Sequence, residues 1–144
     1  MILLDANLLI DARGRALPQH AAAKAWLDAT LRGEGKVGLP WPSLLSFLRI
    51  VTNRRIFTQP DSIASAWKQV DDWLACPNVW VPAPGENHAA ILARTLVCSG
   101  GANHVPDAHL AALAIEHGLT LCSSDGDFAR FAELKWMNPL ASRK

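Results

Sequence analysis

The chain has 144 residues, of which 50% are hydrophobic, so it is long enough for one domain with a substantial core. Its formal net charge of +1 selects no class of partner. No apolar run reaches the length of a membrane span, and Asp5 ends the first apolar stretch too early for a signal peptide, so we expect no membrane association.

The cysteines are odd in number, widely spaced and set among apolar residues: Cys76, Cys98 and Cys122. This pattern favours buried thiols over a disulfide framework or a zinc site. Thiols persist in reducing compartments, and we therefore expect a cytoplasmic protein.

Short apolar runs alternate with helical patterns along the chain. The predicted strands are 2–4, 36–39, 79–81, 119–122 and 134–137. The predicted helices are 6–12, 18–32, 42–53, 59–75, 86–98, 104–117 and a short one after Phe128. This alternation predicts a single three-layer α/β domain over residues 1–144, with a mostly parallel sheet of four or five strands flanked by helices.

Two of the helices have an apolar and a polar side. In the helix after Pro42, the polar side carries Ser43, Ser46, Arg49 and Asn53. In helix 59–75, the apolar side carries Ile63, Trp67, Val70 and Leu74. The chain has six tryptophans and no tyrosine, which indicates packing and protein contacts before base stacking.

Acidic residues stand where two strands and one helix meet the predicted crevice. Asp5 directly follows the first strand, and Asn7 is placed to cap or hydrogen-bond nearby. Asp107 lies in the first turn of a helix that Gly118 ends. Ligands of open α/β sheets bind outside the carboxyl ends of the strands, so both carboxylates reach that edge.

Asp125 and Asp127 follow the strand 119–122 at the same edge. One of the two is expected to coordinate a cation and the other to cap the following helix, and we favour Asp125 as the residue that coordinates. Asp5, Asp107 and Asp125 would repel one another unless a cation lies between them. Mg²⁺ or Mn²⁺ suits this oxygen-rich set, with Asp127 contributing directly or through water.

The histidines do not support a zinc site. His109 points away from Asp107 on the same helix, and the chain contains no His-Glu-x-x-His pattern. We assign His104, His109 and His117 to the surface or to an interface. Five arginines are candidates for a rim that attracts RNA phosphates, although a solvated face is equally consistent: Arg13, Arg15, Arg49, Arg54 and Arg55.

Several motifs resemble the PIN-domain family, and more narrowly its VapC-type toxins. They are Asp5-Ala6-Asn7, the stretch 107–112, the stretch 123–128, and the closing Phe131, Trp136 and 138–140. The resemblance implies a metal-dependent endoribonuclease, the toxin of a type II toxin–antitoxin pair. It implies Asp5, Asp107 and Asp125 as catalytic metal ligands, lined by Asn7, Ser46 and Ser124, and it implies a protein antitoxin and a homodimer.

The sequence departs from the family pattern at one acidic position. The family has a Glu in the helix after Pro42, where this chain has Ser46, and no acid occurs between Glu34 and Asp61. Position 106 is also Pro, where the family commonly has a small polar residue. The alternative is therefore a weakened PIN-like protein that binds RNA or an antitoxin without efficient cleavage. An aspartyl-phosphate phosphatase would need a second Asp where Asn7 stands.

Overall fold

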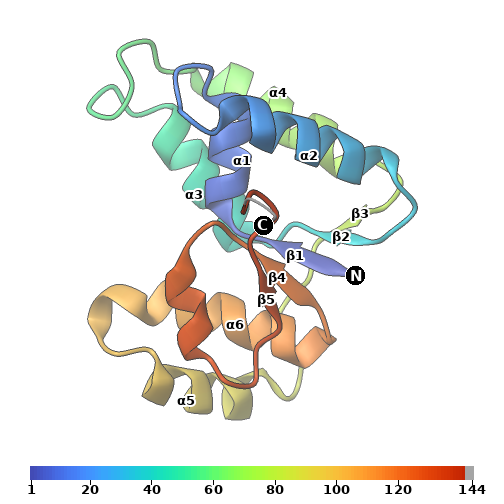
Figure 1. Cartoon of the computed structure of the whole chain (residues 1–144), viewed down its shortest axis with the longest axis vertical. Coiled ribbons are helices and arrows are strands. Elements are labelled where there is room, and N and C mark those ends of the chain that lie inside the picture. The colour runs from blue at the N-terminus through green and yellow to red at the C-terminus, as the bar shows by residue number, and fades with distance from the viewer. Residues whose placement is uncertain (142–144) are drawn as a thin grey trace.

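The computed structural model describes residues 1–141 and contains a five-stranded parallel sheet in the order β3-β2-β1-β4-β5 (Figure 1). The strands are β1 (Ile2–Leu4), β2 (Val37–Gly38), β3 (Val79–Trp80), β4 (Thr120–Cys122) and β5 (Trp136–Met137). The prediction of a mostly parallel sheet is confirmed. The last three residues of the predicted domain, 142–144, lie outside the described part of the chain.

Helices cover both faces of the sheet, which gives the three predicted layers. The α-helices are α1 (Ala6–Arg13), α2 (His20–Arg32), α3 (Trp41–Val51), α4 (Ile63–Leu74), α5 (His88–Cys98) and α6 (Val105–His117). Two 3-10 helices, η1 (Ala102–His104) and η2 (Gly126–Arg130), complete the described elements. Figure 1 shows α1 to α4 on one side of the sheet and α5 and α6 on the other.

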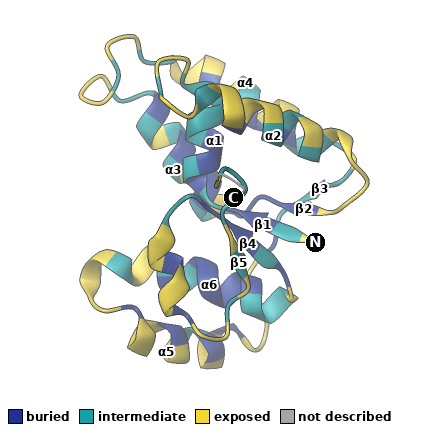
Figure 2. Cartoon of the chain, viewed as in Figure 1, coloured by how far each residue is buried: buried dark blue, intermediate teal, exposed yellow. Residues whose placement is uncertain are grey.

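The core consists of two apolar clusters, one on each face of the sheet. Successive residues of a strand point to opposite faces, so Leu4 and Cys122 join the cluster under α1 to α4. Leu3 and Leu121 join the cluster under α6. Figure 2 shows the buried residues concentrated in the strands and on the inner sides of the helices. The sheet is therefore buried on both faces, as parallel sheets require.

Helix α4 begins later than predicted and buries only part of the predicted apolar side, Val70 and, partly, Leu74. Its N-cap is Ser62, whose hydroxyl accepts a hydrogen bond from the Ser65 amide at 3.1 Å, so the predicted start at residue 59 is wrong. The buried side is Ala66, Val70 and Trp73. Ile63 and Trp67, predicted to be apolar-side residues, are 65% and 45% exposed.

The exposed side of α4 continues onto α3. The rings of Trp41 and Trp67 stack with centroids 6.5 Å apart and an angle of 3° between their planes. Leu45 and Ile63 are also exposed on these helices. We call Trp41, Leu45, Ile63 and Trp67 the exposed tryptophan face; a single small core does not bury all the large apolar residues of this chain.

The cysteines only partly match their prediction. Cys122 is buried, and burial raises the pKa of its thiol to about 12. Cys76 is half-buried and Cys98 is exposed at the end of α5, so the prediction of three buried thiols is wrong for these two. All three are free thiols. Within residues 1–141, every helix is too short or too polar to cross a membrane.

Candidate functional site

Asp5 lies at the junction of β1 and α1, at the carboxyl end of the central strand. Its Oδ1 atom accepts a hydrogen bond from the Ala6 amide at 2.7 Å, so the carboxylate caps α1. Its Oδ2 atom accepts a hydrogen bond from the Ser123 hydroxyl at 2.8 Å. These two contacts orient the carboxylate at the edge of the sheet.

Ser123 is the centre of this edge, and the sequence analysis missed it in favour of its neighbour Ser124. The fully buried hydroxyl donates to Asp5 and accepts from the Asn7 side-chain amide and the Asp125 backbone amide, each at 3.0 Å. The register explains the placement, because Leu4 pairs with Cys122 and the next residues, Asp5 and Ser123, become neighbours. Ser124 is half-buried beside it.

Asp125 and Asp127 have different surroundings. Asp125 is the N-cap of η2, and its Oδ1 atom accepts a hydrogen bond from the Asp127 amide at 2.9 Å. The cap of this short helix is therefore Asp125 and not Asp127, contrary to the favoured assignment, while Asp125 as a metal ligand stays a prediction. Asp127 is exposed, and its Oδ1 atom lies 3.7 Å from Nη2 of Arg130.

Asp107 approaches the edge from the first turn of α6, as predicted. Its Oδ2 atom lies 3.1 Å from Nδ1 of His104, the residue that joins η1 to α6. Both side chains are about a quarter exposed, at 25% for Asp107 and 27% for His104. His104 therefore contacts a candidate site acid, which its assignment as a surface or interface residue did not anticipate.

The three carboxylates influence one another electrostatically. Burial is the largest cause that raises the pKa of Asp5, while the bonds from Ser123 and Ala6 lower it. The charges of Asp107 and Asp125 raise this pKa further. Within residues 1–141, no Lys, Arg or His lies within ion-pair distance of Asp5 or Asp125.

The donors at this edge fit a hard divalent cation. All are oxygens, and Asn7 adds a buried Oδ1 atom without a hydrogen-bond partner in the described chain, which a metal-bound water would satisfy. No three metal-ligating side chains already converge on one point in residues 1–141. A cation held by one or two carboxylates and several waters meets both observations, and this is the coordination that Mg²⁺ prefers.

Comparison with known proteins identifies the family of this chain. The sequence model of the PIN domain matches residues 2–134. The chain belongs to the PIN domain family.

Its curated relatives include Ribonuclease VapC37 of Mycobacterium tuberculosis (strain ATCC 25618 / H37Rv), 44% identical over 142 residues, with 98% of this chain and 99% of the relative covered. VapC ribonuclease Mb2897 of Mycobacterium bovis is 41% identical over 143 residues, covering 97% of this chain and 96% of the relative. Within the PIN domain family, the chain is thus of the VapC type, and the recognition from sequence motifs is confirmed.

Solved structures share this PIN fold at low identity. Mycobacterium tuberculosis VapC20 aligns with a TM-score of 0.68 and 17% identity, over 94% of this chain and 99% of that chain. The structure of VapBC2 from Rickettsia felis bound to a promoter DNA fragment aligns with a TM-score of 0.70 and 15% identity, over 96% and 98% of the two chains. The predicted fold class is confirmed.

Helix α3 is where the resemblance to the PIN domain implies a fourth acid, and this chain has Ser46 there instead. Ser43, predicted to lie on its polar side, is instead buried, and its hydroxyl donates to the Leu4 carbonyl at 2.7 Å. Helix α3 therefore packs against the end of β1, next to Asp5. Ser46 lies one turn further on and is half-buried, while Phe47 beside it is fully buried in the core.

The arginines of this PIN domain fall into two groups. Arg13 is bound within the molecule, because its guanidinium makes two hydrogen bonds of 3.0 Å to the Asp61 carboxylate. It also donates to Gln69 at 3.2 Å and to Ser65 at 2.9 Å. The other arginines of the predicted rim are exposed: Arg15, Arg49, Arg54 and Arg55.

His88 and His109 lie between α5 and α6, and within residues 1–141 no group of histidines and acids is placed to hold a metal ion. His88 is buried, and its Nε2 atom lies 3.2 Å from Nδ1 of His109. Burial, and then the charge of His88, lower the pKa of His109. His117 contacts the Ala83 carbonyl at 2.8 Å through Nε2. His109 and His117 are therefore half-buried residues that contact other parts of the chain, and their assignment to the surface or to an interface stays a prediction.

Proposed function

We propose that this protein is a metal-dependent endoribonuclease and the toxin of a type II toxin–antitoxin pair. The relatives that are more than 40% identical are named ribonucleases of the VapC type. One solved PIN-fold protein, VapC20, is titled a toxin that cleaves the sarcin-ricin loop. These names support RNA as the substrate, and we accordingly propose a cytoplasmic site of action.

The observation that supports this proposal is that three acids from distant segments stand at element ends on the same edge of the sheet. Asp5 follows β1, Asp107 begins α6 and Asp125 follows β4. The pKa of Asp5 rises through burial and through the charges of the other two. Keeping such an uncompensated group costs stability, and a bound cation removes that cost.

In the proposed mechanism, Asp5, Asp107 and Asp125 would hold Mg²⁺ or Mn²⁺, directly or through coordinated water, and Asp127 would contribute an oxygen directly or through water. A bound divalent ion lowers the pKa of its water and neutralises charge that develops on the scissile phosphate. The protein's own part is orientation. Ser123 fixes the Asp5 carboxylate, and His104 fixes the Asp107 carboxylate.

RNA recognition is assigned to exposed basic residues and to the polar side chains of the edge. Arg15, Arg49, Arg54 and Arg55 supply positive charge for phosphates. Asn7, Ser46 and Ser124 line the place where the scissile phosphate binds. Arg13 was predicted as part of this rim. Because Asp61 already neutralises its charge, we propose that it contributes less to phosphate binding than the four exposed arginines.

We further propose a homodimer and a protein antitoxin as partners. The exposed tryptophan face supports a protein contact, since Trp41 and Trp67 remain 43% and 45% exposed on adjacent helices. Large exposed apolar side chains that gather in one place are typical of protein interfaces. Light scattering at high protein concentration tests the dimer, and a monomer there contradicts it.

The test of the activity is cleavage of a structured RNA by the purified protein with Mg²⁺, with Mn²⁺ and with EDTA. We expect cleavage with either metal and none with EDTA, and cleavage by Asp5→Asn slower by about a hundredfold or more with either metal. An intact substrate with both metals would leave only the alternative, a PIN-like binding protein. The ribonuclease names of the curated relatives do not favour that alternative.

A further inference from the structure

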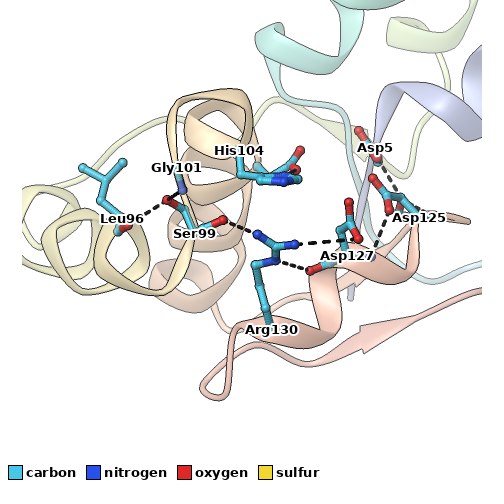
Figure 3. A network of polar contacts seen from close by, with 10 residues as sticks. Asp5, Leu96, Ser99, Gly101, His104, Asp125, Asp127 and Arg130 are labelled. Carbon is cyan, nitrogen blue, oxygen red and sulfur yellow. Dashed lines mark hydrogen bonds and ion pairs between the residues drawn. The ribbon is translucent and has the colours of Figure 1, made fainter.

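Arg130 connects two segments beside the acidic edge, η2 and the loop after α5 (Figure 3). Its Nε atom donates to the Asp127 carbonyl at 3.1 Å, and its Nη2 atom lies 3.7 Å from the Asp127 carboxylate. Its Nη1 atom donates to the carbonyl of Ser99, the residue after α5. One guanidinium therefore joins η2 to the loop that precedes α6.

The loop is shaped to receive this guanidinium. Gly100 has a φ of +83°, which side-chain-bearing residues rarely adopt, and a Cβ atom there would come within 2.7 Å of Nη1 of Arg130. Ser99 is 3% exposed, and its hydroxyl donates to the Leu96 carbonyl at 2.7 Å. Arg130 thus satisfies a backbone carbonyl at a residue that is almost fully buried.

The same loop leads directly to the acid of α6. The amide of His104 donates to the Gly101 carbonyl at 3.1 Å, and the imidazole of His104 contacts Asp107 at 3.1 Å. At the other end of the connection, η2 is capped by Asp125. The path from Arg130 therefore ends at two of the three site acids, one on each side.

We propose that Arg130 is a positioning residue that clamps the Ser99–Gly101 loop onto η2 and thereby fixes Asp107 relative to Asp125. The proposal rests on the proposed function in one respect, that these two carboxylates act together on a cation. The clamp needs a guanidinium, because it donates in two directions at once from a planar group. A lysine supplies the same charge but lacks the planar set of N–H donors that reaches both partners.

The experiment compares Arg130→Ala and Arg130→Lys with a matched control, Arg94→Ala. Arg94 is also an exposed arginine with two hydrogen bonds, each 2.9 Å, to the Glu133 carboxylate, and within residues 1–141 no hydrogen bond joins its side chain to the loop. The readouts are hydrogen exchange of the amides 100–104, Mn²⁺ affinity by calorimetry, and kcat and KM for RNA cleavage.

Both Arg130 variants should exchange the loop amides faster and bind Mn²⁺ about tenfold more weakly, as expected for loss of a group that orients ligands. Their kcat should fall with little change in KM, and Arg94→Ala should match the wild type in every readout. Full recovery by Arg130→Lys would overturn the clamp in favour of a simple charge effect. Faster exchange with unchanged Mn²⁺ affinity would overturn the positioning role.

The proposed function fails by a different result, which is a wild-type protein that binds Mn²⁺ but leaves RNA intact. In that case hydrogen exchange and Mn²⁺ affinity still decide the role of Arg130. A wild-type protein that binds no Mn²⁺ overturns the positioning role as well.

Discussion

The two ends of α1 carry residues of opposite charge, and the two residues differ in whether an oppositely charged side chain neutralises them. At its start, Asp5 is half-buried near Asp107 and Asp125, and their charges and its burial raise its pKa. At its end, Arg13 forms a two-bond ion pair with Asp61, and this pairing raises the pKa of the guanidinium. The surroundings therefore disfavour the charged form of Asp5 and favour the charged form of Arg13.

This difference separates a structural charge from a functional one. The side chains of Arg13 and Asp61 are only 28% and 26% exposed, and their pairing ties α1 to the segment before α4. Nothing further is needed to neutralise them. Asp5 has hydrogen-bond donors from Ala6 and Ser123 but lacks a cationic partner within residues 1–141, so its charge is available for an ion or a substrate.

The largest expected effect comes from removing the unpaired charge. Asp5→Asn should lower RNA cleavage by about a hundredfold or more, because several kcal/mol of metal-dependent stabilisation is lost. Its free energy of unfolding in EDTA should change by less than about 1 kcal/mol, since the relieved repulsion offsets one lost hydrogen bond. Cleavage assays and urea unfolding measure the two quantities, and a variant that cuts as fast as the wild type contradicts the site.

Removing the paired charge should have the reverse outcome. Arg13→Ala should lower the free energy of unfolding by about 1–3 kcal/mol, because Asp61 loses a charged partner at a partly buried position. RNA cleavage per folded molecule should fall far less than in Asp5→Asn. A double-mutant cycle with Asp61→Ala isolates the pair, and a coupling energy near zero would show that the contact is not stabilising.

Adding a charge sharpens the comparison on the acidic side. Ser46→Glu should tighten Mn²⁺ binding by about tenfold, or about 1.4 kcal/mol, by supplying a fourth carboxylate. The wild type should bind weakly without substrate and favour Mn²⁺ over Mg²⁺, following the order of divalent affinities. Calorimetry on both proteins is the measurement. If the variant neither binds more tightly nor cuts faster, Ser46 is not the position that the family fills with an acid.

The smallest effect is a pH dependence of stability in EDTA. Because the pKa of Asp5 is raised in the folded protein, the folded state takes up this proton before the unfolded state does. Wild-type stability should therefore rise relative to Asp5→Asn as the pH falls from 7 through the folded pKa of Asp5 and towards its ordinary value of 3.8. Urea unfolding of both proteins at several pH values is the measurement. A difference in free energy of unfolding that stays constant with pH would contradict the raised pKa of Asp5.

The sequence predicted the order of elements because the signals are local. Apolar runs such as 2–4 and 119–122 are too short for helices, and Gly118 ends α6 in a left-handed conformation with a φ of 66°. The same reasoning failed for α4, where helical spacing alone did not show which side packs. Trp67 satisfied the period and still faces outwards, because Trp73 fills the core against Phe47.

By itself, the sequence determined which acids stand at strand and helix ends: Asp5, Asp107 and Asp125. Only the tertiary structure decided how they are held. Ser123 became the central hydroxyl because β1 and β4 pair in a register that places it beside Asp5, and Arg130 reached Ser99 because η2 packs near the loop after α5. Such contacts join residues far apart in the chain, and the pairing of strands and packing of helices that creates them has no local signal.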